Sequence, residues 1–235
     1  MLRFYLAVMG VALAGCTVAP SGGPVPSTQP IGTGQPQVSQ LPSGDFGAVV
    51  RRVEPVAENM CRQRAPQKNC DFLILLDTRK NAPSNAFQTL DKSGRPVLIV
   101  TQALVDDTQN ADEIAFVLSH EAAHHIEDHL PRTQQSASGG AMVAGLIVAA
   151  YGGSPEMVQS AQEFGAMAGA RVYSKNYELE ADRTGTVIAK AAGFNPVRGA
   201  EFFTRISDPG DQFLGTHPPN GDRQRIVQQT AAQLD

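Results

Sequence analysis

The sequence predicts an α+β fold: a helix-rich domain with a small β-sheet. Two short apolar runs bounded by turn residues, 71–77 (DFLILLD) and 96–101 (PVLIVT), predict the strands. Helical spacing over 112–129 and 173–185, with a helix start at 154–156, predicts a largely helical remainder. The chain has 235 residues and a net charge of −4, so it suits one globular domain with a full core. Its mild acidity argues against a nucleic-acid partner.

The N-terminus has the pattern of a targeting segment. Arg3 precedes an uncharged apolar run over 4–13, which is typical of a signal peptide. The following Leu-Ala-Gly before Cys16 resembles the lipobox of bacterial lipoproteins. That resemblance implies a signal peptide over 1–15, a lipid on Cys16 and, with threonine next, sorting to the outer membrane. An ordinary secretory signal with a chance cysteine is the alternative.

The segment after the lipobox has the composition of a linker. Residues 17–44 hold six prolines, five glycines and no charged residue, so they lack the apolar surface needed to fold. We therefore expect 16–44 to be a lipidated cysteine with a disordered tether, and 45–235 to be the folded domain.

Two cysteines remain once Cys16 is set aside. An exported compartment is oxidising, so Cys61 and Cys70 are predicted to form a disulfide. Their spacing is wider than that of a usual zinc pair. Two free buried thiols are the alternative.

Four of the five histidines lie within 118–129 (LSHEAAHHIEDH). His120 and His124 are four residues apart and share one helix face. In the H-E-x-x-H arrangement two such imidazoles bind zinc, and the intervening glutamate, here Glu121, is the general base. A chance match on a surface helix is the alternative.

The other two histidines of this segment lie elsewhere on the expected helix. If 112–129 is one helix with 3.6 residues per turn, His125 and His129 face away from the metal. We expect them to be packing or surface residues.

The segment 173–185 (YSKNYELEADRTG) supplies the next candidates. Glu178 and Asp182 are four apart and share a helix face. Glu178 would complete a two-histidine, one-glutamate zinc site with one open position. Asp182 would accept a hydrogen bond from a ligand histidine. Glu180 points elsewhere and is expected to be a surface charge.

The last histidine, His217, stands in a His-Pro-Pro loop, and Arg223 follows near the start of a C-terminal helix. Side chains of these types could stabilise the oxyanion of a tetrahedral intermediate. The apolar run 141–151 (AMVAGLIVAAY) is too short to span a bilayer. It is either a core helix or a membrane-facing or lid element.

Three motifs in order, HEAAH, ELEADRTG and HPPNGDR, resemble the zinc endopeptidase family of the HtpX heat-shock protease and CAAX prenyl protease 1. More narrowly, the chain is similar to the soluble, periplasmic, lipid-anchored members of that family. The resemblance implies a helix-rich, zincin-like (gluzincin-type) metalloprotease domain that holds one Zn2+ per chain. It also implies roles for seven residues: ligands His120, His124 and Glu178, base Glu121, supporting Asp182, and His217 and Arg223 in the active-site cleft.

The stretch 84–106 resembles the family's segment before the zinc helix, with an edge strand that borders the cleft. We expect an extended substrate to pair with that strand by β-augmentation. The residues predicted to contact substrate are Val97, Leu98, Ile99 and Val100.

Two functions follow as expectations. The first is a membrane-anchored periplasmic endopeptidase of a Gram-negative bacterium that removes unfolded or misfolded exported and outer-membrane proteins. Its partners would be those polypeptides, the membrane through the N-terminal lipid, and outer-membrane assembly machinery. The second is a latent or chaperone-like binding module in which His217 caps the zinc.

Overall fold

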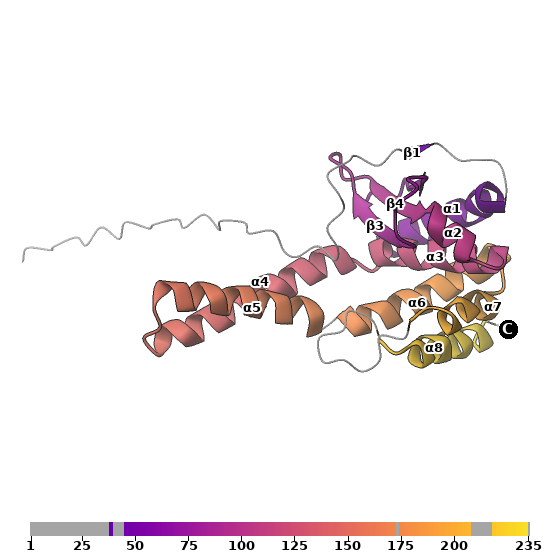
Figure 1. The fold of residues 1–235 in the computed structure, drawn as a ribbon. Helices are drawn as coiled ribbons and strands as arrows, with labels where there is room; N and C mark the ends of the chain where they lie inside the picture. The colour runs from indigo at the N-terminus through magenta and orange to yellow at the C-terminus, as the bar shows by residue number, and fades with distance from the viewer. Residues whose placement is uncertain (1–37, 40–44, 173, 208–217, 235) are drawn as a thin grey trace, which may run out of the picture.

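The structure is a computed structural model, and it describes residues 38–39, 45–172, 174–207 and 218–234. Figure 1 shows a body of helices beside a small sheet, with a two-helix projection at one side. The helices are α1 (Asp45–Arg64), α2 (Gln102–Asp107), α3 (Ala111–Ile126), α4 (His129–Ala150), α5 (Pro155–Val172), α6 (Ser174–Ala191), α7 (Pro196–Gly199), the 3-10 helix η1 (Ala200–Thr204) and α8 (Asn220–Ala232). The strands are β1 (Val38–Ser39), β2 (Leu73–Asp77), β3 (Ala86–Leu90) and β4 (Pro96–Thr101).

The predicted α+β, helix-rich fold is confirmed. The core lies between α1, α3 and the sheet and continues to α6 and α8. Its largest fully buried side chains include Phe72, Phe116, Leu98 and Leu118. The helices that carry the candidate site residues therefore pack against a common core, which fixes their relative positions.

Helix α1 begins at Asp45 and is joined to the start of the sheet by a disulfide. Cys61 and Cys70 are both buried, their Cα atoms lie 5.6 Å apart, and their sulfur atoms are bonded. The predicted disulfide is therefore present in the structure. The preceding segment contributes only β1 to the described residues, and Cys16 lies outside them.

The sheet has the strand order β1-β2-β4-β3. Strands β2 and β4 are parallel, and β3 and β4 form an antiparallel hairpin with Gly94 in its turn at a φ of 81°. A positive φ of this size is readily adopted by glycine alone. The short β1 pairs antiparallel with β2.

The prediction that Val97, Leu98, Ile99 and Val100 form the edge strand is wrong. They lie in β4, an interior strand bonded to β2 on one side and β3 on the other, and all four are buried. A continuous apolar run is typical of a strand covered by neighbours. The two edge strands are β1 and β3, and β3, whose mixed sequence AFQTL is only partly buried, is the one that contacts α3.

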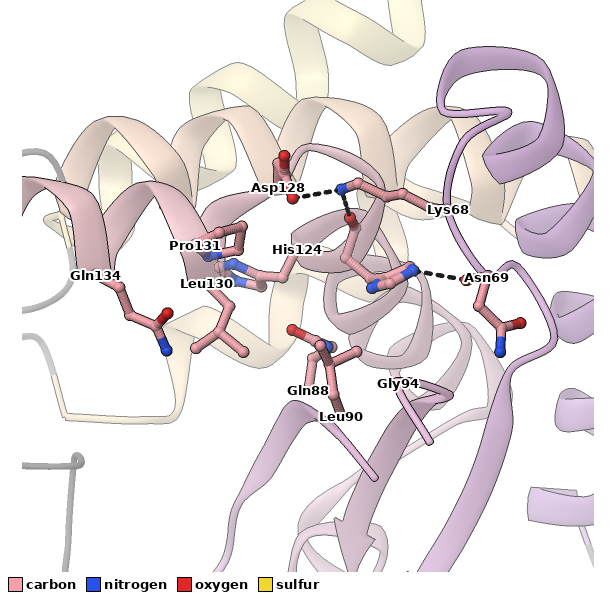
Figure 2. A pocket seen from close by; sticks show the side chains of 11 residues that line it. Lys68, Asn69, Gln88, Leu90, Gly94, His124, Asp128, Leu130, Pro131 and Gln134 are labelled. Carbon is pink, nitrogen blue, oxygen red and sulfur yellow. Dashed lines mark hydrogen bonds and ion pairs between the residues drawn. The ribbon is translucent and has the colours of Figure 1, made fainter. Parts of the chain in front are cut away.

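The predicted helix over 112–129 is divided by a sharp turn. Helix α3 ends at Ile126, Asp128 takes a left-handed φ of 65°, and α4 begins at His129. Lys68 holds the turn by donating to the carbonyl of His125 and pairing with Asp128 at 2.8 Å. Figure 2 shows this arrangement. Residues on either side of the turn therefore do not follow one helical wheel.

A pocket of about 280 Å³ lies between the end of β3, the hairpin turn and the α3–α4 turn. Gln88 and Leu90 line it from β3, and Leu130 and Pro131 line it from α4. His124 reaches its wall from α3 (Figure 2). The pocket thus connects the edge of the sheet with one of the predicted metal ligands.

Helices α4 and α5 form an antiparallel hairpin that projects from the body (Figure 1). Several large apolar side chains on it face solvent, among them Leu146 (64% exposed) and Tyr151 (90%). A core helix over 141–151 is therefore ruled out, whereas a membrane-facing or lid role stays a prediction. Within the described residues, no helix combines the length and apolar character needed to cross a membrane.

Candidate metal centre

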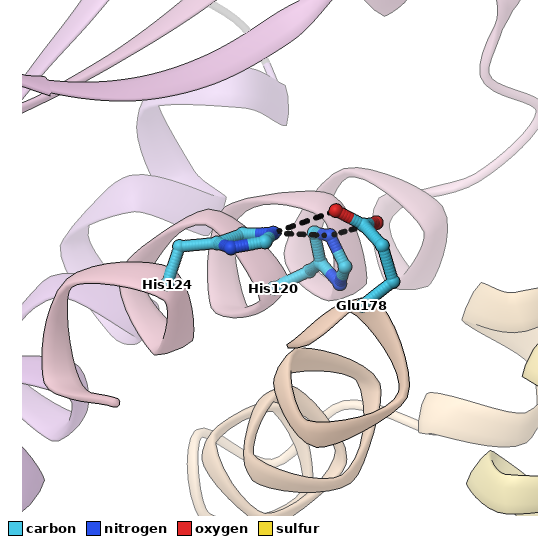
Figure 3. Close-up of side chains that lie close together, drawn as sticks. All are labelled: His120, His124 and Glu178. Atoms are coloured by element: carbon cyan, nitrogen blue, oxygen red, sulfur yellow. Dashed lines mark hydrogen bonds and ion pairs between the residues drawn. The ribbon is translucent and has the colours of Figure 1, made fainter. Parts of the chain in front are cut away.

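Helices α3 and α6 bring three predicted ligands together. Asn110 caps the start of α3 by accepting from two backbone N–H groups, and His120 and His124 follow on one face of that helix. Glu178 reaches them from α6 (Figure 3). Their ligand atoms all lie within 4.8 Å of one another.

Close packing of the two helices depends on Gly185 of α6. A Cβ atom at this position would lie 3.0 Å from both the Cα and the backbone nitrogen of His120. Such a contact is tighter than packed side chains normally make, so a larger residue would push α6 away from α3. The glycine therefore helps to bring Glu178 to the two histidines.

The spacing of the three ligand atoms fits a zinc ion. His120 Nε2 lies 3.0 Å from His124 Nε2 and 3.3 Å from Glu178 Oε2, and His124 Nε2 lies 3.4 Å from the other carboxylate oxygen, Glu178 Oε1. Ligands about 2.0–2.1 Å from zinc at the corners of a tetrahedron are separated by about 3.3–3.4 Å. The three side chains therefore lie close enough together to share one metal ion, and two imidazoles with one carboxylate are a donor set typical of catalytic zinc.

Asp182 lies behind His120. Its Oδ1 is 2.8 Å from His120 Nδ1, the contact that the sequence prediction requires. Arg223 donates to both oxygens of this carboxylate, with Nε and Nη2 each 2.7 Å from an Asp182 oxygen, and its Nη2 also lies 3.2 Å from His120 Nδ1. All three side chains are buried. The carboxylate therefore fixes the outer nitrogen of His120 as a donor and directs Nε2 toward the ligand group.

The charges of this trio shift their pKa values. Burial raises the pKa of Asp182, but Arg223 and His120 together outweigh burial, and the net pKa is lowered. Burial lowers the pKa of His120, but Asp182, helped by Glu178, raises it to about 10. Burial dominates at His124 and lowers its pKa to about 3, so this imidazole is neutral.

His129 lies beside His124, where the single-helix prediction does not place it. Its Nδ1 is 2.9 Å from His124 Nδ1, and its Nε2 is 3.1 Å from Glu180 Oε2. The expectation that His129 faces away from the ligand group is therefore wrong, although His129 is a buried packing residue as expected. The cause is the turn at Asp128, because His129 begins a new helix and no longer follows the helical wheel of α3. A left-handed residue at this position has no strong sequence signal. Glu180 is about one-third exposed, and it pairs with His129.

Glu121 follows His120 on α3 and is half-buried. Burial lowers the pKa of Arg223, but Asp182, Glu178 and, to a smaller degree, Glu121 raise it. Arg223 itself is buried with Asp182 and also lies 3.7 Å from Glu178, so it is part of the site. His217 lies outside the described residues. The roles of Glu121, His217 and Arg223 in a reaction stay predictions.

His125, in contrast, is directed away from the ligand group. Its Nε2 is 2.8 Å from the carbonyl oxygen of Asn69, and its ring packs edge-on against Phe72. Burial lowers its pKa. The prediction that His125 is a packing residue is confirmed.

The chain is similar in sequence to two known proteases. It is 33% identical over 132 residues to a Vibrio cholerae protein that carries the name beta-barrel assembly-enhancing protease, a match covering 49% of the chain and 26% of that protein. It is 26% identical over 150 residues to a beta-barrel assembly-enhancing protease of Yersinia pestis, covering 58% of the chain and 31% of that protein.

The chain thus spans less than a third of the length of either relative. The sequence model of peptidase family M48 matches a much larger part of this chain, residues 45–231. That range contains the histidine and glutamate group and both helices that carry it. The chain therefore belongs to peptidase family M48, a family of metallopeptidases.

Proposed function

We propose that the chain is a zinc-dependent endopeptidase that cleaves unfolded or misfolded proteins outside the cytoplasm. The observation that carries the proposal is the convergence of His120, His124 and Glu178, whose ligand atoms lie within 4.8 Å of one another, because two imidazoles and one carboxylate are a donor set typical of catalytic zinc. Peptidases of family M48 are zinc-dependent, and we propose one Zn2+ per chain at these three residues.

The chemistry divides between the metal and Glu121. When bound, zinc would polarise a peptide carbonyl and make water nucleophilic at neutral pH. Glu121 accepts the proton of the attacking water and delivers it to the leaving amine. Its place directly after His120 on α3 puts it beside the ligand group without making it a ligand. Asp182 and Arg223 keep His120 in the orientation that this arrangement needs.

We propose that the substrate lies along β3. This strand is one of the two edges of the described sheet and contacts α3, so an extended peptide could add to it through backbone hydrogen bonds. The pocket lined by Gln88, Leu90 and Leu130 would receive a side chain next to His124. Pairing through the backbone selects for extended, unfolded segments more than for a particular sequence.

The proposed location rests on the N-terminal pattern. Residues 1–15 would be removed, Cys16 would carry the lipid, and 17–44 would tether the domain to the periplasmic face of the outer membrane. The two relatives are named for β-barrel assembly. We therefore propose that unfolded outer-membrane β-barrel proteins are among the substrates and that outer-membrane assembly machinery is a partner.

Digestion of an unfolded substrate tests the proposal. The purified chain should cleave reduced, carboxymethylated protein, lose this activity with a zinc chelator, and regain it when zinc is added back. The same protein in its native fold should be cut much more slowly. If zinc binds but no cleavage occurs, the capped, chaperone-like alternative replaces the protease. If the chain binds no zinc, both are excluded.

A further inference from the structure

His124 requires a partner that the H-E-x-x-H pattern does not supply. Its Nε2 faces His120 and Glu178, so a metal bound there leaves the proton of the neutral ring on Nδ1. That Nδ1–H is on the buried side of the ring and needs an acceptor. Asp182 accepts from Nδ1 of His120, but among the described residues it makes no hydrogen bond with His124.

His129 lies where such an acceptor is needed. Its Nδ1 lies 2.9 Å from His124 Nδ1, and its side chain is only 4% exposed. An imidazole that accepts through Nδ1 carries its own proton on Nε2. That nitrogen is 3.1 Å from Glu180 Oε2, so its N–H can donate a hydrogen bond to the carboxylate. One tautomer of each ring satisfies every contact.

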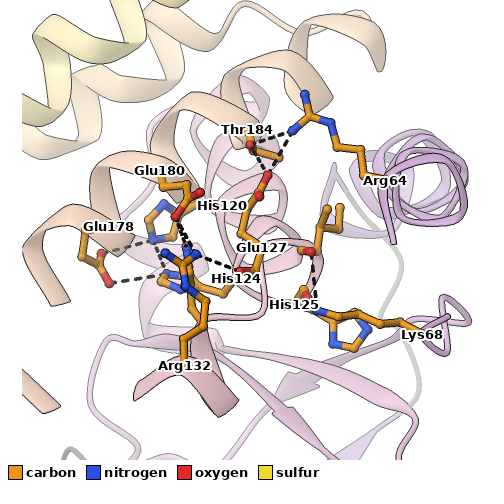
Figure 4. Close-up of polar contacts among 12 residues, drawn as sticks. Arg64, Lys68, His120, His124, His125, Glu127, Arg132, Glu178, Glu180 and Thr184 are labelled. Carbon is orange, nitrogen blue, oxygen red and sulfur yellow. Dashed lines mark hydrogen bonds and ion pairs between the residues drawn. The ribbon is translucent and has the colours of Figure 1, made fainter. Parts of the chain in front are cut away.

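The end of this chain is fixed by further contacts. Arg132 Nη1 lies 2.8 Å from the same Glu180 oxygen, and its guanidinium stacks over Tyr177 at 4.2 Å. The ring of His129 also stacks on Tyr177, at 4.8 Å between centroids. Figure 4 shows Arg132 and Glu180 close to His124 and Glu178. Residues of α4 and α6 thus clamp His129 in one orientation.

We propose that His129 and Glu180 are positioning residues that orient the metal ligand His124 through a relay of two hydrogen bonds. His124 Nδ1–H donates to His129 Nδ1, and His129 Nε2–H donates to Glu180. The two histidine ligands are then held differently. His120 donates directly to the carboxylate of Asp182, whereas His124 donates to the neutral ring of His129, which in turn donates to the carboxylate of Glu180. The inference rests on the zinc site proposed above.

Zinc affinity of the full chain tests the relay. His129→Ala removes the acceptor and should weaken zinc binding roughly 10- to 100-fold in a chelator competition, the range typical of such supporting contacts. His129→Asn keeps an acceptor near the Nδ1 position and should recover part of the loss. His125→Ala is the matched control, because His125 is a buried histidine of the same segment directed away from the metal; its zinc affinity should stay within about twofold.

Nuclear magnetic resonance of the zinc-loaded wild type provides a second readout that does not depend on any variant folding. Long-range 1H–15N spectra should show His124 protonated on Nδ1 and neutral His129 protonated on Nε2. If His129 carries its proton on Nδ1, the relay is wrong. If His129→Ala does not fold, Glu180→Ala takes its place, since Glu180 is more exposed.

Two outcomes separate this inference from the proposed function. Wild type that binds no zinc overturns the proposed function itself. Wild type that binds zinc, with His129→Ala or Glu180→Ala binding it equally well, overturns the relay alone.

Discussion

Arg223 balances the charge on the buried side of the centre. Asp182 is fully buried. Arg223 donates two hydrogen bonds to its carboxylate, and His120 makes one further contact with it. Its guanidinium also lies over the ring of Phe203 at 3.9 Å. Removing one member of a buried ion pair leaves the other charge without compensation, which costs more than the pair contributes.

Arg223→Met should therefore lower the free energy of unfolding by about 3–5 kcal/mol. Arg225→Met is the control on the same helix, because Arg225 pairs with Asp222 at the surface, where such pairs contribute about 0–1 kcal/mol. Denaturant unfolding of both variants measures the difference. Equal midpoints for the two would contradict the role given to Arg223.

Among single residues, the sequence predicts those whose geometry is local. His120 and His124 share a face because they are four apart on one helix, and Glu178 and Asp182 do so for the same reason. The position of His129 depends on the left-handed Asp128, which tertiary contacts with Lys68 hold in place. No periodicity in the sequence encodes that turn.

Among the elements, the α4–α5 hairpin is held by small residues. A Cβ atom on Gly165 would collide with the backbone carbonyl of Gly140, and one on Gly169 would collide with that of Ser136. The two helices therefore approach closely along a line of glycines, while larger apolar side chains point outward. Packing of this kind tolerates little added volume.

Gly165→Ala should cost about 1–3 kcal/mol in stability, because the new methyl group overpacks the hairpin. Gly139→Ala is the matched variant, since a Cβ atom there meets nothing within 4 Å; it should stabilise α4 by about 0.5–1 kcal/mol. Thermal unfolding followed by circular dichroism compares them. A shift of the same sign in both would show that the helices do not pack as described.

At the scale of elements, the sequence predicts whether a segment is a helix or a strand better than it predicts which segments lie next to it. The run 96–101 is a strand with the bounds expected, but its apolar residues reflect burial between β2 and β3. An apolar run does not reveal which strand is at the edge, because that depends on pairing between distant segments. Likewise, the apolar run of α4 resembles a core helix by composition although it lies on the surface.

At the scale of the whole molecule, the proposed lipid on Cys16 would determine where the protease acts. Cys16→Ser removes the thiol that would carry the lipid, whereas Cys61 and Cys70 stay bonded to each other. Expressed with its signal in a Gram-negative host, wild type should fractionate with membranes and Cys16→Ser with the soluble periplasmic proteins. If Cys16→Ser remains in the membrane fraction, the lipid is not the anchor.

The most direct test of the central claim compares zinc content and cleavage in Glu121→Gln. The three ligand residues are unchanged, so the variant should bind as much zinc as wild type. Loss of the general base should slow cleavage of an unfolded substrate by about 100-fold or more. Glu163→Gln, on the exposed side of α5, should cleave at the wild-type rate. A zinc-loaded Glu121→Gln chain that cleaves as fast as wild type would contradict the account.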